Sequence, residues 1–430
     1  MRGITTFGLI GMPLACLILG VGGLLALAYM FRVRGTRLLY VEVFVLSFLL
    51  RIGLIFLNEH YLIFEHKVAG ERSLLLYQKY LLGIGGFANL YSNLLQFAKE
   101  QFAVQTLINA PFFAAFGEDL MTILYSNALF GAITGSVAAL MLHNAFGEKV
   151  AQRALILFAL YPASINFSIF GLRDPLIYFF MTVFAIAAIS SYMGLARTFH
   201  ILVSGVAAVC MLLLRPELAY VVVALIGLLI FPSVIGSISP HQRPIERWAV
   251  AGVFFAVAGV FTVAMAILSL KVAAAQIGAA SINPADFAGE NAVERFERSE
   301  DSDFGGGSHL MSGDLYRNLP AYVRVPIQTA GLVILPFPWM ITGIAQAFAF
   351  LDSLFLMGLM FLASLYLRRR SRFRVVVWGL LLSYCVGILG MGFIVSNAGN
   401  GFRMRFGVVP LCLLAGSFSS FIPTFRLHRD

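Results

Sequence analysis

The feature that most constrains this chain is a succession of apolar runs, each close to 20 residues long. Such runs begin near residues 7, 38, 120, 346 and 374, among others, and short polar loops separate them. A helix of about 20 apolar residues crosses the hydrocarbon core of a bilayer, whereas barrel strands are short and alternate apolar with polar residues. Only 12% of the residues are charged, and an average soluble domain has roughly twice that share. The runs therefore predict an all-α, polytopic helical membrane protein.

Arginine-rich loops orient the predicted spans, because short cytoplasmic loops carry an excess of Lys and Arg. The strongest marker is RRRSRFR at 368–374, and basic loops also occupy residues 32–37, 143–153 and 240–248. With all of them inside, the chain makes about eleven crossings (ten to thirteen) and its N-terminus is outside. We expect one transmembrane domain, residues 1–430, in the cell inner (plasma) membrane, with its site facing the periplasm or exterior. The net charge of +9 lies largely in these loops and does not indicate nucleic-acid binding.

Two long outer segments interrupt the series of spans. Residues 58–118 form the first outer loop, and the stretch from about 84 to 116 has aromatics at helical spacing, which favours helices lying along the interface. Residues 271–345 form an outer lid loop that ends in an apolar run containing Pro336 and Pro338. Because prolines interrupt a helix, we expect this run to be re-entrant or interfacial and not a straight span.

Five arginines lie at the outer ends of five different segments, where the positive-inside bias depletes them. They are Arg51, Arg173, Arg215, Arg403 and Arg405. If the helices bundle, these ends surround one outward cavity. A guanidinium is a planar fork of donors that stays charged, so it suits phosphate. A lipid-linked monophosphate or diphosphate would place its phosphate at this depth.

Local ion pairs are the alternative explanation for some of these arginines. Arg173 would pair with the adjacent Asp174, and Arg215 with Glu217. Arg403 and Arg405 have no acidic residue nearby in the sequence. Arg51 shares its span with Glu42, so it is either a functional group, half of a buried pair, or a side chain that snorkels to the outer surface.

Transfer of a sugar at such a site also needs a base that activates the acceptor hydroxyl, usually a carboxylate. The first outer loop offers Glu59, Glu65 and Glu71, each of which has the alternative of being a solvated loop residue. Asp301 and Asp303 have the spacing of a metal-binding pair and are the only indication of a divalent metal. Apart from that pair we expect no cofactor.

Four motifs, in this order, give the chain a resemblance to the GT-C superfamily of membrane glycosyltransferases, in particular the bacterial family-39-like and exopolysaccharide-assembly proteins. The first is a small residue, Gly, an acid and a later Tyr, approximated by Ala69–Glu71 and Tyr77, with Glu where the family usually has Asp. A helix hairpin follows, with the aromatic-Pro and basic-Asp pairs. A Gly-Gly-Ser lid and a Pro-Phe-Pro-Trp turn come next, and an Asn-Gly…Arg-x-Arg…Pro end closes the series. In this chain the helix hairpin has Tyr161–Ser164 and Arg173-Asp174. The lid and the turn are Gly306–Ser308 and Pro336–Trp339, and the closing motif lies within Asn397–Pro410.

The resemblance implies an enzyme that uses a polyprenyl-phosphate-linked sugar. Arg403, Arg405 and Arg173 would hold the phosphate, helped by Arg215 and Arg51, and Glu71 or Glu59 would take the proton of an acceptor glycan, lipid or protein. Further substrate contacts are expected from Tyr77, Asp174, Asn397 and Asn400. Two alternatives stay open: a polymerase or ligase that uses lipid-diphosphate oligosaccharides, and a transporter of lipid-linked glycans. Transporters commonly have inverted repeats and sites at mid-depth, and neither is evident here.

Overall fold

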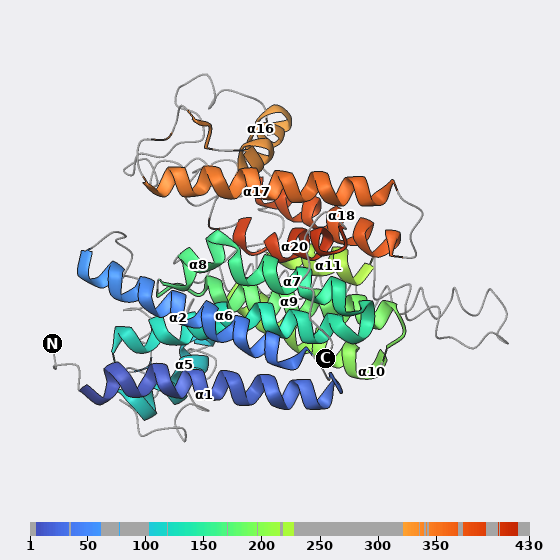
Figure 1. Cartoon of the computed structure of the whole chain (residues 1–430). Helices are drawn as coiled ribbons and strands as arrows, with labels where there is room; N and C mark the ends of the chain where they lie inside the picture. Colours follow the sequence, from blue (N-terminus) through green and yellow to red (C-terminus); the bar gives the residue numbers. More distant parts are fainter. Residues whose placement is uncertain are drawn as a thin grey trace, which may run out of the picture. The chain divides into compact units, whose positions relative to one another are not determined.

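A computed structural model of the chain describes thirteen helices and parts of the loops between them (Figure 1). The described residues are 6–33, 36–61, 77, 103–117, 119–169, 171–195, 197–215, 218–227, 321–334, 336–338, 341, 344–368, 373–392, 403 and 405–419. Within them every regular element is a helix, as the sequence predicts. Glu65, Glu71, the Asp301–Asp303 pair, Asn397 and Asn400 lie outside the described residues, as does the run expected to cross at 249–270.

The chain divides into two compact units. The first holds eight helices: α1 (Thr6–Met30), α2 (Arg37–Tyr61), α5 (Ala103–Phe116), α6 (Leu120–Phe146), α7 (Glu148–Leu160), α8 (Pro162–Ser168), α9 (Asp174–Tyr192) and α10 (Arg197–Leu214). The second holds five: α11 (Ala219–Leu225), α16 (Ala321–Ile334), α17 (Ile344–Leu367), α18 (Arg374–Gly392) and α20 (Val409–Ser417). The last residues of α9 are assigned to the second unit.

Helix α6 is the hub of the first unit and packs against α1, α2, α5, α7 and α8. Within its apolar window 89% of residues are buried, against 28% for α1. Its start is fixed by Asp119, whose side chain accepts a hydrogen bond from the amide of Met121, and its end by Gly147 at φ 87°. Helix α2 runs antiparallel to α6, because Ser136 Oγ donates to the carbonyl of Tyr40 and Phe56 lies near Tyr125 at the other end.

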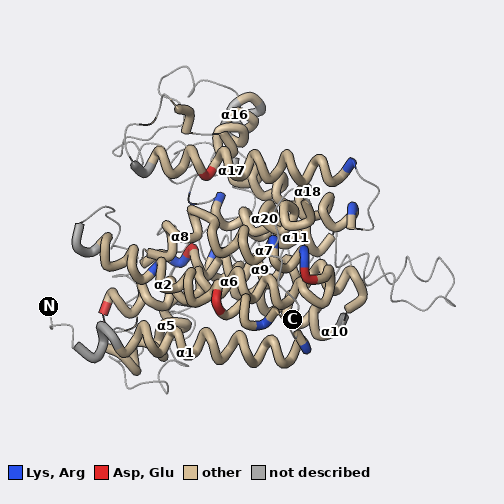
Figure 2. Tube along the Cα trace, viewed as in Figure 1, with Lys and Arg blue, Asp and Glu red and all other residues tan. Residues whose placement is uncertain are grey.

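Polarity in α2 and α5 is reversed from that of a soluble protein. In α2, Ser47 and Arg51 are buried while Leu46 and Leu50 are exposed. In α5 the buried polar residues are Gln105, Thr106 and Asn109, and the exposed positions are apolar: Leu107, Pro111, Ala114 and Ala115. Apolar side chains outside and polar ones inside suit a hydrocarbon solvent, in which a polar group needs a protein partner. Charged positions are accordingly sparse along the helices (Figure 2).

A sharp bend separates α7 from α8. The sequence predicts one span over 151–168, but the helix breaks at Tyr161 and the two halves differ in direction by 49°. Tyr161 is extended, with φ −62° and ψ 118°, because a residue before proline avoids the helical region and Pro162 follows it. The bend turns the serines of α8 toward α2.

In the second unit, α18 packs against α11, α16, α17 and α20. Close packing requires two glycines. A Cβ on Gly387 would lie 2.7 Å from Val408, and one on Gly416 would lie 2.9 Å from Leu359. Helix α16 ends at Ile334, just before Pro336, so the predicted interruption occurs there.

Six helices are long and apolar enough to cross a membrane, or seven if the bent pair α7–α8 counts as one span. The six are α1, α2, α6, α9, α17 and α18. They begin at or close to the positions that the apolar runs predict. This count covers only the described residues, and the eleven crossings and their orientation stay predictions.

Candidate functional site

Two buried amides hold the turn between α8 and α9. Nε2 of Gln105, on α5, donates to the carbonyl of Gly171 at 3.1 Å. Nδ2 of Asn127, on α6, donates to the carbonyl of Leu172 at 2.7 Å. Both amide side chains are fully buried. The turn thus has a fixed position, and it immediately precedes Arg173.

Arg173 and Asp174 begin the next helix from this turn, and both are buried. The carboxylate of Asp174 accepts a hydrogen bond from Nη2 of Arg215 at 2.8 Å, and the two form an ion pair. Arg215 follows the last turn of α10, so the pair joins α9 to α10. Asp174 is 41 residues from Arg215 in the sequence. Glu217, the neighbour that the sequence suggested, lies outside the described residues, so that pair stays a prediction.

Arg51 is a buried cation in the first unit with an unusual environment. It lies in α2, about 10 Å from the end of the span at Asn58 at 1.5 Å per residue, and is 0% exposed. Its guanidinium donates to three serine hydroxyls and one carbonyl: Ser47 Oγ, Ser164 Oγ at 3.1 Å, Ser168 Oγ at 3.2 Å and Ser47 O at 3.0 Å. All of these oxygens are neutral.

The alternatives of a buried Glu42–Arg51 pair and of a snorkelling Arg51 are both wrong. Glu42 is exposed, and none of the hydrogen bonds of Arg51 goes to a carboxylate. A snorkelling side chain would extend to the surface, whereas Arg51 is directed at α8, which the bend at Pro162 brings toward it.

Helix α6 contacts both the Arg51 site and the turn that precedes Arg173. Asn127 bonds to Leu172, and one turn further Gly131 faces Ser168 and Arg51. Residues four apart lie on one face of a helix, about 6 Å from each other along its axis. Arg51, the turn at 171–174 and the Asp174–Arg215 pair therefore gather at one end of the first unit. Three of the five predicted arginines are brought together there.

Replacing Gly131 with alanine is expected to disrupt the Arg51 site. A Cβ there would lie 2.0 Å from Ser168 Oγ and 3.0 Å from Nε of Arg51. Ser168 would have to rotate away from the guanidinium, and overpacking of this kind costs about 1–3 kcal/mol. The measurement is the thermal unfolding midpoint of the purified protein in detergent. Gly23→Ala in α1 is the matched control, since nothing lies within 4 Å of its added Cβ. Equal midpoints for the two variants would show that α6 does not approach Arg51.

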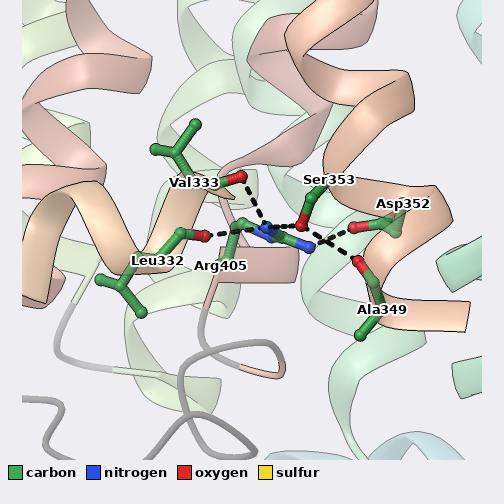
Figure 3. Close-up of polar contacts among 6 residues, drawn as sticks. All are labelled: Leu332, Val333, Ala349, Asp352, Ser353 and Arg405. Atoms are coloured by element: carbon green, nitrogen blue, oxygen red, sulfur yellow. Dashed lines mark hydrogen bonds and ion pairs between the residues drawn. The ribbon is translucent and has the colours of Figure 1, made fainter. Parts of the chain in front are cut away.

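Arg405 belongs to the second unit and has a different environment (Figure 3). Its Nη2 forms an ion pair with Asp352, and its Nη1 donates to Ser353 Oγ at 2.9 Å and to the carbonyl of Leu332 at 2.8 Å. The carbonyl of Val333 is a further, longer contact. Arg405 is 1% exposed.

These contacts make Arg405 a connection between helices. Leu332 and Val333 are in the last turn of α16, where carbonyls have no partner within the helix. A cation also interacts favourably with the helix dipole at that end. No acidic residue lies near Arg405 in the sequence, and its ion-pair partner Asp352 is 53 residues away.

The remaining predicted residues are less informative. Arg403 is half-buried. Glu59 lies in the last turn of α2. Tyr77 is buried against Phe113 of α5, with ring centroids 4.7 Å apart, and belongs to a small apolar cluster with Ala110 and Ile123. Its predicted substrate contact stays a prediction.

Several residues of these networks were not singled out from the sequence. They are Ser47, Gln105, Asn127, Asp352 and Ser353. A usable signal was present, because polar residues in apolar runs point to the inside of a bundle. Asp352 stands near the start of a 24-residue helix that contains no other charged residue.

No family model, curated protein or solved structure matches the chain.

Proposed function

We propose that the protein is a membrane glycosyltransferase of the GT-C type, which transfers a sugar from a polyprenyl-phosphate-linked donor to an acceptor on the outer face of the membrane. The resemblance of the four ordered motifs supports this reaction class. Cell-surface polysaccharide assembly is the process in which such a transfer would take part.

The observation that carries the proposal is the environment of Arg51. Among the described residues its hydrogen bonds all go to neutral oxygens. A buried charge without a counter-charge is costly, and proteins normally pair or neutralise it. A guanidinium suits a phosphate oxygen, because phosphate accepts hydrogen bonds and supplies the negative charge. A lipid phosphate that enters the bundle from the outer leaflet would complete this site, with Arg173 close by.

In the reaction, the phosphate of the donor is held by arginines while the acceptor hydroxyl loses its proton to a carboxylate, for which Glu71 and then Glu59 are the candidates. The acceptor oxygen forms a bond to the anomeric carbon as the bond from that carbon to the phosphate oxygen breaks. Polyprenyl phosphate leaves with the bonding electrons. The segment 271–325 would close over the site and exclude water.

The direct test uses purified protein reconstituted in liposomes with undecaprenyl-phosphate-linked hexoses and a crude glycan acceptor. Release of undecaprenyl phosphate that depends on the acceptor is the expected result. A polymerase or ligase would instead use undecaprenyl-diphosphate oligosaccharides and ignore the monosaccharide lipids. Lipid flipping without any transfer would identify a transporter and contradict the enzyme proposal.

Two substitutions outside the sites described above test the assigned roles. Glu71→Gln keeps the size of the side chain and removes its basicity, so transfer is expected to stop while protein abundance is unchanged. Arg403→Ala is expected to abolish transfer in the same way by removing a phosphate contact. Both are measured as glycan produced per unit of protein in the membrane. Normal glycan from either variant would refute the role of that residue.

A further inference from the structure

The inner face of α5 is a second polar feature of the first unit. Gln105 and Asn109, one helical turn apart, are 0% exposed. Gln105 donates to the carbonyl of Gly171, and the amide oxygen of Asn109 accepts a hydrogen bond from Ser126 of α6. This face therefore borders the turn that precedes Arg173.

Each of these two amides retains one atom with no hydrogen-bond partner among the described residues: Oε1 of Gln105 and Nδ2 of Asn109. Turning the amides over does not remove the deficit. Gln105 must present its nitrogen to the carbonyl of Gly171, because a carbonyl cannot donate, and a turned Asn109 would leave its oxygen unpaired instead. Native proteins pair about nine-tenths or more of their buried polar groups, so two deficits on one face need an explanation.

We propose that this face of α5 binds the hydroxyl groups of the sugar on the lipid-linked donor, an inference that rests on the proposed function. A hydroxyl both donates and accepts hydrogen bonds, so neighbouring hydroxyls of one sugar ring can satisfy an acceptor on Gln105 and a donor on Asn109. The two residues lie about 6 Å apart along the helix axis at 1.5 Å per residue, a separation that one pyranose ring spans. No other ligand class suggested by the sequence carries several hydroxyls side by side.

The surroundings of the two amides agree with this assignment. One turn beyond Asn109, Phe113 packs against Tyr77 with ring centroids 4.7 Å apart, and together they form an aromatic surface next to the polar face. On the other side, Gln105 holds the turn that leads into Arg173. A sugar on this face would thus lie between aromatic rings and the arginine end of the unit, as a sugar phosphate requires.

Entry of a sugar requires α5 to move, and two described features of α5 favour such a movement. It has 14 residues with Pro111 inside, and it packs less extensively against α6 than α7 does. Elements with few packing contacts open at the lowest free energy.

The test measures lipid binding to the full-length protein in nanodiscs by native mass spectrometry. The probes are undecaprenyl phosphate and a panel of undecaprenyl-phosphate-linked glucose, mannose, galactose and arabinose. The wild type is expected to prefer one sugar-bearing lipid over the bare phosphate. Asn109→Leu is expected to lower the affinity for that sugar-bearing lipid about tenfold, which is the loss expected for one or two hydrogen bonds. Its affinity for undecaprenyl phosphate is expected to be unchanged.

Two further variants keep the result interpretable. Asn109→Leu is nearly isosteric and leaves Ser126 its bond to the carbonyl of Ile123, so its unfolding midpoint is expected to equal or exceed that of the wild type. If it does not fold, Asn109→Ser replaces it, with the same expected loss. Gln152→Leu in α7 is the matched control, because this buried amide also has an unpartnered oxygen but its nitrogen bonds to Glu148. It should bind both lipids normally.

The outcomes separate this proposal from the proposed function. Preference for the sugar lipid that disappears in Asn109→Leu but persists in Gln152→Leu supports the sugar site. Equal binding of both lipids by the wild type, or a preference that Asn109→Leu retains, overturns the sugar site while phosphate binding still stands; water alone then satisfies the amides. Failure to bind either lipid would overturn both.

Discussion

Arg405→Ala is expected to lose most of its folded protein. The substitution leaves Asp352 buried without its cation and leaves the last carbonyls of α16 without a donor. Removing one partner of a buried ion pair costs about 3–5 kcal/mol, a large fraction of the stability of most proteins. Abundance in the membrane and the thermal unfolding midpoint in detergent are the measurements, and both should fall.

The loss of stability is expected to come from the broken Arg405–Asp352 ion pair and not from the absence of the Arg405 side chain alone. Asp352→Ala is expected to destabilise as Arg405→Ala does, because it leaves the guanidinium unpaired. The double variant Arg405→Met/Asp352→Leu should recover much of the loss, since replacing both charges with apolar groups of similar volume is often neutral. A double variant that loses as much stability as Arg405→Ala and Asp352→Ala together would show that the two side chains do not interact.

Arg405→Lys separates charge from geometry at the same position. An ammonium is a point charge with three donors on a flexible stem, whereas the guanidinium reaches Asp352, Ser353 and the α16 carbonyls at once. Lysine is therefore expected to recover the ion pair but not the connection to α16. An Arg405→Ala protein that is stable and abundant yet inactive would return Arg405 to the phosphate-binding role that the sequence suggested.

The course of the helices could be predicted from the sequence because the signals are local. Apolar runs of spanning length, and charges at their ends, fix where α1, α2, α6, α17 and α18 begin. The bend at Pro162 also had a local signal, the proline itself, but a proline in an apolar run either continues or breaks a span. Which helix lies at the centre had no such signal. All the runs are apolar, so hydropathy does not distinguish α6 from the less buried α1.

The sequence identified arginines as the candidate site residues, but it did not identify the residues with which they pair. Positive charge at segment ends identified Arg51, Arg215 and Arg405 as residues that need an explanation. The explanations differ because the partners lie far away in the sequence: Asp174 is 41 residues from Arg215, and Asp352 is 53 from Arg405. Searching for acids nearby in the sequence could not find either pair. Of these three arginines, Arg51 differs in that its hydrogen bonds within the described part of the chain all go to neutral oxygens.

Arg51→Met is expected to have the opposite pattern to Arg405→Ala: a stable protein without activity. The partners left behind are serine hydroxyls, and Ser168 and Ser47 also bond to the carbonyls of Ser164 and Ala159. No buried charge is orphaned, so the unfolding midpoint should stay the same or rise. Transfer from the lipid-linked sugar, by contrast, is expected to fall about 100-fold or more, because a preorganised donor to a charged oxygen is worth that much.

Measurements of stability and activity on variants of Arg51 and Arg405 thus distinguish a functional cation from a structural one. Arg51→Lys is the control for charge. It keeps the positive charge but cannot direct donors at Ser47, Ser164 and Ser168 together, so activity is expected between that of wild type and that of Arg51→Met. Loss of folding in Arg51→Met, with activity per folded molecule unchanged, would make Arg51 a second structural connection and leave the first unit without a phosphate site. Stability in Arg51→Met matters as much as its inactivity, because a ligand that supplies the missing negative charge is the reason to retain a buried cation among neutral oxygens.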